Sequence, residues 1–297
     1  MKKIRAAIVG YGNIGKYVLE ALEAAPDFEV AGIIRRNPND IPDELKAYTV
    51  TDSITKLDKV DVAVLATPTR SVEEHAKEIL ALGINTVDSF DIHGGIVDLR
   101  RSLDAVAKAH NTVAVISAGW DPGSDSVVRA LLERWCRKVL LIPPSPRHEY
   151  GAYGCREGYR RREGGFKYDD SFGNRCTPSY GLYRGRRRIR FQASVCRIKA
   201  DDYFAHDETH VMRVECVDNL LDMGHGVNLV RKGVSGKTQN QLIEFDMKIN
   251  NPALTAQILV SVARASLKQQ PGAYTMIELP IIDMLYGERE NLIRRLV

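Results

Sequence analysis

A glycine-rich turn near the start of the chain constrains the fold more than any other feature. The turn follows the apolar run Ile4–Val9, matches the pattern G-x-G-x-x-G and consists of Gly10, Tyr11, Gly12, Asn13, Ile14 and Gly15. A helical pattern comes next, and Glu29–Ile34 then has the composition of a second strand. This order is typical of a βαβ unit that binds a dinucleotide, because backbone N–H groups at the helix N-terminus can approach a pyrophosphate. A glycine-rich turn without a ligand is the alternative.

The residues after the second strand indicate which dinucleotide the turn would bind. An NAD site usually carries Asp or Glu at this point, where the carboxylate accepts a hydrogen bond from the ribose 2′-OH. Here the strand runs into Arg35 and Arg36. Two guanidinium groups suit the 2′-phosphate of NADP, which a carboxylate would repel. We therefore predict NADP as the cofactor; a solvated arginine pair at a strand end is the alternative.

Strand and helix patterns continue to alternate after this unit. Buried-strand patterns occupy Val60–Ala66, Asn85–Asp88 and Thr112–Ile116, and helical patterns occupy 72–82 and about 97–110. The alternation predicts an α/β fold, a Rossmann-type doubly wound parallel sheet with right-handed crossovers. Thr67, Pro68 and Thr69 follow the first of these strands. They should lie at the carboxyl edge of the sheet, where such folds bind ligands, and we assign them to the cofactor site.

Two carboxylates stand just past the ends of successive predicted strands. Asp91 follows one strand, and Asp121 follows the next within a Gly-Trp-Asp-Pro-Gly sequence. Both loops should open toward the nicotinamide end of the cleft, where a carboxylate can hold an ammonium group and accept a proton from it. Each Asp could instead be a turn or cap residue, since Asp-Pro-Gly is good turn chemistry, and Trp120 could be plain core.

The C-terminal third has clear patterns of its own. Gln241–Ile249 alternates as a strand, and Asn251 and Pro252 precede an amphipathic helix over 253–268. We expect this helix to return and cover the sheet of the first domain. His225 lies in a glycine-flanked stretch that we interpret as a loop, where a single histidine is more often structural than functional.

The length of 297 residues allows two domains. We place a dinucleotide-binding domain at 1–121, joined by 252–297, and an α+β substrate-binding and dimerisation domain at 122–251. No apolar run approaches the roughly 20 residues of a membrane span, and the N-terminus leads directly into a strand rather than a signal peptide. We therefore expect a cytoplasmic protein that does not bind membranes.

Five stretches together resemble one enzyme family. They are Val9–Gly15, Val87–His93, Gly119–Gly123, Met223–Gly226 and Asn251–Ala256. V-D-S-F-D paired with G-W-D-P-G behind a nucleotide-binding fold is specific to meso-diaminopimelate dehydrogenase. The chain resembles that family over about 1–133 and 200–297.

The resemblance implies a reaction and a set of residue roles. The reaction is the reversible oxidative deamination of meso-2,6-diaminopimelate at its D-configured carbon, with NADP as hydride acceptor and L-2-amino-6-oxopimelate and ammonia as products. Asp91 and Asp121 would hold the reacting amine beside Trp120. His225 and Asn251 would bind the distal, L-configured end. Such an enzyme would serve diaminopimelate and lysine biosynthesis, and we expect a homodimer.

The segment from Arg134 to Lys199 departs from this family. It holds 14 Arg and 3 Lys against 5 acidic residues, a local excess of +12 in a chain whose net charge is +4. Only 8 of its 66 residues are Ile, Leu, Val or Met, too few for a stretch of this length to offset the entropy of ordering. The glycine-rich loop, Thr and Arg with which the family binds the substrate carboxylate are not visible in it.

Three interpretations of this segment remain open. It could be a basic insertion that binds nucleic acid through stacked Tyr and Arg, or a divergent substrate domain. We favour a third, a compensated pair of frame changes in the gene. Codons can be chosen for Arg134–Ile142 that encode AMVPKGITY, a family-like sequence, when the frame moves by one base. Resequencing the coding region distinguishes the three.

Two other functions compete with the dehydrogenase. One is an NADP-dependent reductase of the dihydrodipicolinate-reductase type, although the pair of histidines with a nearby lysine used by that family is not apparent. The other is a nucleotide-sensing regulator that contacts nucleic acid through the basic segment, which steeply salt-dependent binding would reveal. We regard a nucleic-acid partner as the weaker prediction, and meso-diaminopimelate as the expected ligand.

Overall fold

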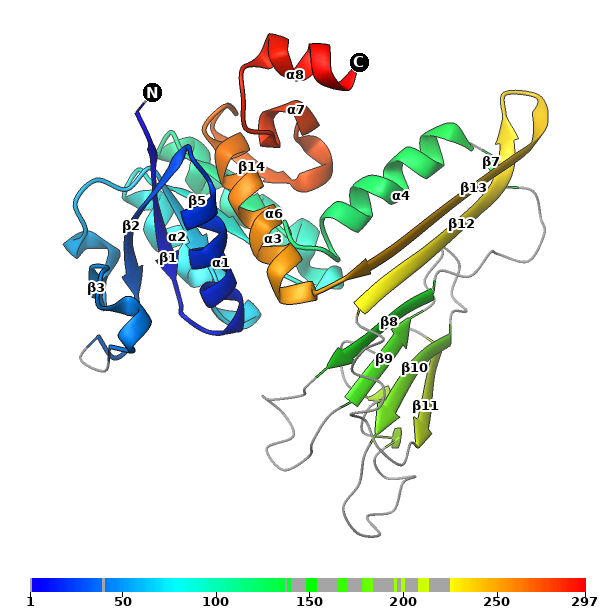
Figure 1. Cartoon of the computed structure of the whole chain (residues 1–297), viewed down its shortest axis with the longest axis horizontal. Coiled ribbons are helices and arrows are strands. Elements are labelled where there is room, and N and C mark those ends of the chain that lie inside the picture. The colour runs from blue at the N-terminus through cyan, green and yellow to red at the C-terminus, as the bar shows by residue number, and fades with distance from the viewer. Residues whose placement is uncertain are drawn as a thin grey trace. The chain divides into compact units, whose positions relative to one another are not determined.

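The computed structural model describes residues 2–38, 41–136, 138–139, 148–153, 165–169, 178–183, 195–196, 199–200, 208–213 and 225–297. Two compact units are present: Met1–Ala130 with Asn251–Val297, and Leu131–Asn250 (Figure 1). The boundary near residue 130 falls inside helix α4 (Ser124–Trp135), whereas the sequence suggested a break at the Asp-Pro-Gly turn. The chain thus passes from one unit to the next through a continuous helix.

The first unit is built on a seven-stranded sheet. Its strands are β1 (Ile4–Val9), β2 (Phe28–Ile34), β3 (Val50–Thr51), β4 (Val62–Leu65), β5 (Asn85–Asp88), β6 (Val113–Ile116) and β14 (Gly272–Thr275). They are ordered β14-β6-β5-β4-β1-β2-β3, and every pairing in the sheet is parallel. The predicted doubly wound Rossmann-type sheet is confirmed. Strand β14, an edge strand, was not predicted.

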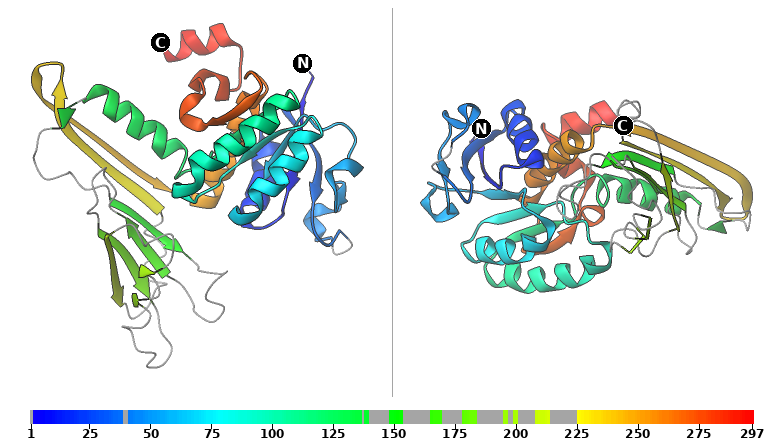
Figure 2. Two further views of the ribbon diagram at one scale, coloured as in Figure 1. Left: turned by 180° about the vertical axis from the view of Figure 1, so that it is seen from behind. Right: turned by 90° about the horizontal axis from the view of Figure 1, so that it is seen from below.

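Helices cover both faces of this sheet. They include α1 (Asn13–Ala24), α2 (Val72–Ala81), α3 (Ile96–Ala109) and α6 (Asn251–Ser266). Helix α6 packs on α1 and on strands β4, β5 and β6, so the prediction that it returns to the sheet is confirmed. Figure 2 shows the two helical layers, α1 and α6 in blue and orange and α2 and α3 in cyan and teal. The shorter helices α7 (Ile281–Met284) and α8 (Arg289–Leu296) follow β14.

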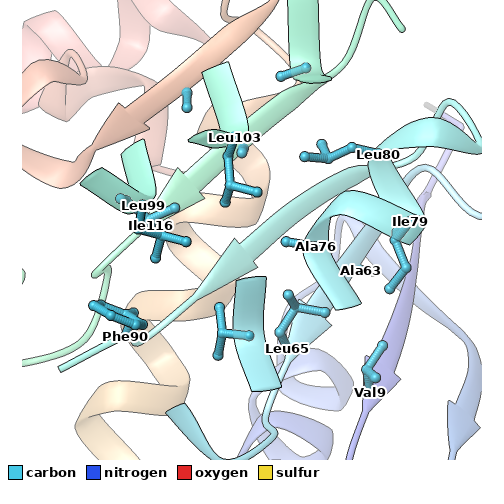
Figure 3. Packing of buried hydrophobic residues seen from close by; sticks show 14 of the residues in the cluster. Val9, Ala63, Leu65, Ala76, Ile79, Leu80, Phe90, Leu99, Leu103 and Ile116 are labelled. Atoms are coloured by element: carbon cyan, nitrogen blue, oxygen red, sulfur yellow. The ribbon is translucent and has the colours of Figure 1, made fainter. Parts of the chain in front are cut away.

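Burial on both faces explains why the central strands read as continuous apolar runs. All four residues of β4 and all four of β6 are buried. Alternate side chains point to opposite faces of the sheet. Those on one face pack with α2 and α3 in a single cluster, which includes Val9, Ala63, Leu65, Leu80, Leu99, Leu103 and Ile116 (Figure 3). This packing fixes the positions at which the strands end and the loops begin.

A buried ion pair fastens α6 to the turn before β2. Arg264, 8% exposed, donates from Nε and Nη2 to the carboxylate of Asp27 at 2.5 and 2.8 Å. Its Nη1 donates to the carbonyl of Met284 at 2.8 Å. Because one guanidinium bonds three oxygens from two segments, it ties the C-terminal elements to the sheet of the first unit.

The second unit contains a separate, mostly antiparallel sheet. Its strands are β7 (Lys138–Val139), β8 (His148–Tyr153), β9 (Gly165–Asp169), β10 (Pro178–Tyr183), β11 (Glu208–Arg213), β12 (His225–Ser235) and β13 (Thr238–Ile249). They are ordered β11-β10-β9-β8-β12-β13, with β7 beside β12, and β10 and β11 run parallel. The first four strands lie in the basic segment, where composition predicted no regular structure. Most of the remaining residues of that segment lie outside the described residues. The structure therefore does not decide between the three interpretations of the segment.

One loop expectation in this unit is wrong. His225 is the first residue of β12 and pairs with Ile249 at the end of β13. Glycines on either side of His225 suggested a loop, but the long partner strand β13 supplies hydrogen bonds that extend β12 to this point.

Across the described ranges of the chain, none of the helices has the length and apolar character needed to cross a bilayer.

Candidate functional site

The glycine turn packs tightly on one side and is open on the other. Gly10 has φ of +95°, and a Cβ there would lie 2.6 Å from the carbonyl oxygen of Ala66. A Cβ on Gly15 would meet the carbonyl oxygen of Gly10. At Gly12, by contrast, a Cβ would have no described heavy atom within 4 Å. Glycine is therefore needed at 10 and 15 for close backbone approach, while the open side at Gly12 leaves space for a ligand.

The turn leads into the N-terminus of helix α1. Gly12 is the N-cap, and in the described part of the chain no side chain caps this end. The first helical bond runs from the N–H of Lys16 to the carbonyl of Gly12 at 3.0 Å. The N–H groups of the residues before Lys16, Asn13 and Ile14 among them, therefore have no acceptor within the helix. A helix end of this kind suits a pyrophosphate.

The end of β2 brings positive charge to the same place. Gly10 donates its N–H to the carbonyl of Ile34 at 3.0 Å, so the turn and the β2 end are joined. The guanidinium carbon of Arg35 lies 6.0 Å from the centre of the Tyr11 ring, and the ammonium of Lys16 lies 5.8 Å from it. Arg36 is exposed beside them. Arg35 and Arg36 therefore follow the end of β2 beside the glycine turn.

The loop after β4 lies against the turn. Ala66, whose carbonyl oxygen leaves no room for a Cβ on Gly10, donates its N–H to the carbonyl of Val9 at 2.8 Å. Thr67, Pro68 and Thr69 continue from it, and Thr69 begins the 3₁₀ turn Thr69–Ser71. The hydroxyl of Thr69 donates to Oδ1 of Asp91 at 2.7 Å. This bond links the predicted cofactor loop directly to one of the two predicted catalytic carboxylates.

Asp121 sits in a different environment from Asp91. The Asp91 residue is exposed, whereas the Asp121 side chain is only 4% exposed. Arg129, on helix α4, donates from Nη2 to Asp121 Oδ1 at 2.7 Å and lies 2.9 Å from Oδ2 of the fully buried Asp125. One guanidinium thus pairs with two carboxylates and fixes the Asp121 side chain. Trp120, at 2% exposure, belongs to the packed interior beside it.

Sequence reasoning missed Arg129 and Asp125. The signal available was their spacing of four residues, which places them on one face of a helix that starts just after the Asp-Pro-Gly turn. It missed Asp88 as well, which is fully buried at the end of β5. Burial raises the pKa of the Asp88 carboxyl to about 6, against hydrogen bonds from the backbone of Phe90 and Ser117 that lower it.

Asn251 is the first residue of α6 and lies near the loop that carries Asp121. Its side-chain oxygen accepts a hydrogen bond from the hydroxyl of Thr255 at 2.9 Å. A Cβ on Gly119 would lie 3.4 Å from the methyl group of Thr255, so this loop packs directly against the first turns of α6. His225 belongs to the other unit, and its side chain lies outside the described residues. The first unit therefore contains every predicted site residue except His225.

Comparison with known proteins identifies the family. The model of an oxidoreductase family with an NAD-binding Rossmann fold matches residues 4–117. The meso-diaminopimelate D-dehydrogenase of Bacteroides fragilis is 57% identical over 305 aligned residues, which cover 100% of each chain. Among solved structures, a variant of the meso-diaminopimelate dehydrogenase of Clostridium tetani, determined with diaminopimelate, is 26% identical. It covers 99% of this chain and 100% of its own, with a TM-score of 0.76.

A second solved structure matches the fold. An engineered D-amino acid dehydrogenase bound to NADP⁺ has a TM-score of 0.74 at 23% identity and covers 100% of both chains. The sequence agrees with these relatives over its full length, and so does the fold. The oxidoreductase family model also matches most of the N-terminal part of the first unit. The chain belongs to the meso-diaminopimelate D-dehydrogenase family of NAD(P)-binding oxidoreductases.

Proposed function

We propose that the protein catalyses the NADP-dependent, reversible oxidative deamination of meso-2,6-diaminopimelate. The observation that carries this proposal is the 57% identity, over the full length, to a relative named for that activity. Hydride leaves the D-configured carbon of the substrate together with an amine proton, and an imine forms. Water then adds to the imine, and ammonia leaves to give L-2-amino-6-oxopimelate.

The residues that we assign to the cofactor all belong to the first unit. The open side of Gly12 and the uncapped N-terminus of α1 would hold the pyrophosphate. Arg35 and Arg36 would bind the 2′-phosphate, which favours NADP over NAD. Thr67, Pro68 and Thr69 would line the same pocket beside the turn. Bound NADP⁺ supplies the acceptor for the hydride.

Asp91 and Asp121 would hold the substrate's reacting amine, next to Trp120. An ammonium must lose a proton before its nitrogen lone pair can assist hydride departure, and a nearby carboxylate can accept that proton. The Thr69 hydroxyl orients Asp91 at 2.7 Å, and Arg129 orients Asp121 at the same distance. An anchored carboxylate loses less entropy on binding the amine than a mobile one.

The distal, L-configured end of the substrate would be bound by Asn251 and His225. Asn251 stands at the start of α6, where its side chain is already oriented by Thr255. Its amide can donate to a carboxylate, and a histidine can do the same. We also propose that the protein acts as a cytoplasmic homodimer in diaminopimelate and lysine biosynthesis, and light scattering tests the dimer.

The test is an activity assay with a matched set of substrates. Purified protein is mixed with meso-diaminopimelate and NADP⁺, and NADPH is followed at its absorbance band near 340 nm. Turnover of the meso isomer with NADP⁺, weaker turnover with NAD⁺ and none with the L,L isomer support the proposal. The assay is run on the chain as written and on a version with the frame of 134–199 restored. NADPH binding without turnover of any diaminopimelate isomer by either version contradicts the proposal.

A further inference from the structure

Asp88, the last residue of β5, connects the two loops that carry the candidate catalytic carboxylates. Its Oδ1 accepts hydrogen bonds from the N–H of Phe90 at 2.9 Å and from the N–H of Ser117 at 3.1 Å. Its own carbonyl accepts the N–H of Ala118 at 2.8 Å. Phe90 directly precedes Asp91 in one loop, while Ser117 and Ala118 open the other. One residue therefore holds both loops through three hydrogen bonds.

These three hydrogen bonds join the two chain segments just beyond the point where the pairing of β5 with β6 ends. The pairing of β5 with β6 ends at Val87 and Val115. Ser117 then adopts φ of +54°, in the left-handed region that non-glycine residues seldom occupy. Such a conformation costs free energy and persists only when the surroundings impose it. The bond from the Ser117 N–H to Asp88 is part of what imposes it here.

The burial of Asp88 is costly for stability. Its residue is 0% exposed, and its Oδ2 has no hydrogen-bond partner among the residues that the structure describes. Burying half of a carboxyl group without a partner is unfavourable, and an apolar residue would avoid that penalty. Asp88 bonds two loops of the candidate site although its burial is unfavourable. Its presence is therefore better explained by the geometry that it imposes on those loops than by a contribution to stability.

We propose that Asp88 is a positioning residue that sets the placement of the Asp91 and Asp121 loops relative to each other. This proposal rests on the proposed function, in which Asp91 and Asp121 hold the reacting amine. Asp88 is buried and acts through the backbone of both loops, so it does not touch the substrate. Loosening this connection should slow turnover without weakening cofactor binding, because Asp88 makes none of the hydrogen bonds of the glycine turn or of the arginines after β2.

The experiment compares three variants at neighbouring positions of β5. Asp88→Ala removes the acceptor, whereas Asp88→Asn keeps an oxygen that can accept from both Phe90 and Ser117. Val87→Ala perturbs the same strand at a fully buried position without removing any of the three bonds. The variants are made in whichever version of the chain, as written or with the frame of 134–199 restored, turns over meso-diaminopimelate. Steady-state kinetics, NADPH affinity and amide hydrogen exchange at Phe90, Ser117 and Ala118 are measured for each.

The expected result is a loss specific to Asp88→Ala. Its kcat falls about 10- to 100-fold, as expected for misplaced catalytic groups, and its NADPH affinity stays within about twofold. Exchange at Phe90 and Ser117 accelerates in this variant. Asp88→Asn restores both kcat and protection to near the parent values, and Val87→Ala lowers the melting temperature but leaves kcat unchanged.

Three outcomes would overturn the proposal. They are wild-type kcat in Asp88→Ala, an equal loss of kcat in Val87→Ala, and an Asp88→Asn variant as impaired as the alanine variant. If neither version of the chain turns over meso-diaminopimelate, the proposed function fails instead. The exchange rates then decide by themselves whether Asp88 connects the two loops.

Discussion

Strand β4 in the first unit and strand β13 in the second obey different burial rules. All four residues of β4 are buried, whereas Gln241–Ile249 alternates between half-buried and exposed positions. The first pattern is that of a parallel sheet covered by helices on both faces, and the second that of an antiparallel sheet with one solvated face. The first unit is organised by its own core, and it contains the glycine turn and the two candidate carboxylates Asp91 and Asp121.

Charge separates the two regions further. The segment 134–199 falls entirely in the second unit and carries an excess of +12, so the rest of the chain carries −8. The residues proposed to hold the cofactor and the reacting amine all belong to the first unit, so substitutions there and changes in the basic segment should have different effects. The following predictions test that difference, from the largest expected effect to the smallest.

Asp121→Asn should produce the largest loss. Removing a carboxylate that accepts the amine proton is expected to lower kcat/KM for meso-diaminopimelate by about 10²- to 10⁴-fold. NADPH affinity, measured by fluorescence titration, should not change. Asp98→Asn is the control, because Asp98 lies on α3 with its side chain 85% exposed. Equal effects of the two substitutions would show that Asp121 has no special role.

Asp88→Asn should change the pH dependence of stability. The Asp88 pKa is raised from 3.8 to about 6 in the folded protein, so the neutral carboxyl stabilises the fold below pH 3.8 and this contribution is lost as pH rises through 6. The variant lacks this titration. Its unfolding free energy relative to the parent should therefore rise by about 3 kcal/mol between pH 3.5 and pH 7. Denaturant unfolding at several pH values in this range measures the free energy of unfolding of both proteins. A constant difference between them across the range would contradict the prediction.

Restoring the frame of 134–199 should raise activity while leaving cofactor binding alone. A segment that misplaces the substrate is expected to cost about 10²-fold in turnover, because small displacements of reacting groups have effects of this size. Both versions of the chain should bind NADPH equally, since the turn and arginines lie in the first unit. Full activity of the chain as written would refute the frame-change interpretation and favour a divergent substrate domain.

Arg35→Gln should have the smallest effect, confined to the cofactor. Loss of one charge-assisted hydrogen bond to a 2′-phosphate is expected to weaken NADPH binding about 10- to 100-fold. Affinity for NADH, which lacks that phosphate, should not fall. Arg36→Gln is the matched variant and separates the contributions of the two guanidinium groups. An equal loss for NADH and NADPH would mean that Arg35 supports the turn rather than the phosphate.

Local patterns in the sequence were sufficient for much of the first unit. The strands β1 and β5 begin and end where the sequence predicted, and α2 differs by one residue at its end. Such elements could be predicted because propensity, burial and turn chemistry all agree over a few neighbouring residues. Strand β12 was not predicted, because its long partner strand, rather than its own glycine-containing sequence, decides that it forms and where it begins.

The sequence by itself determined that a glycine turn opens a βαβ unit, and that two aspartates follow the ends of neighbouring strands. It could not show which groups those aspartates contact. Thr69 reaches Asp91 across 22 residues, and Asp88 reaches Ser117 across 29. Only the tertiary structure decided these contacts, because they depend on sheet order and on the packing that fixes where each strand ends, neither of which is encoded in neighbouring residues.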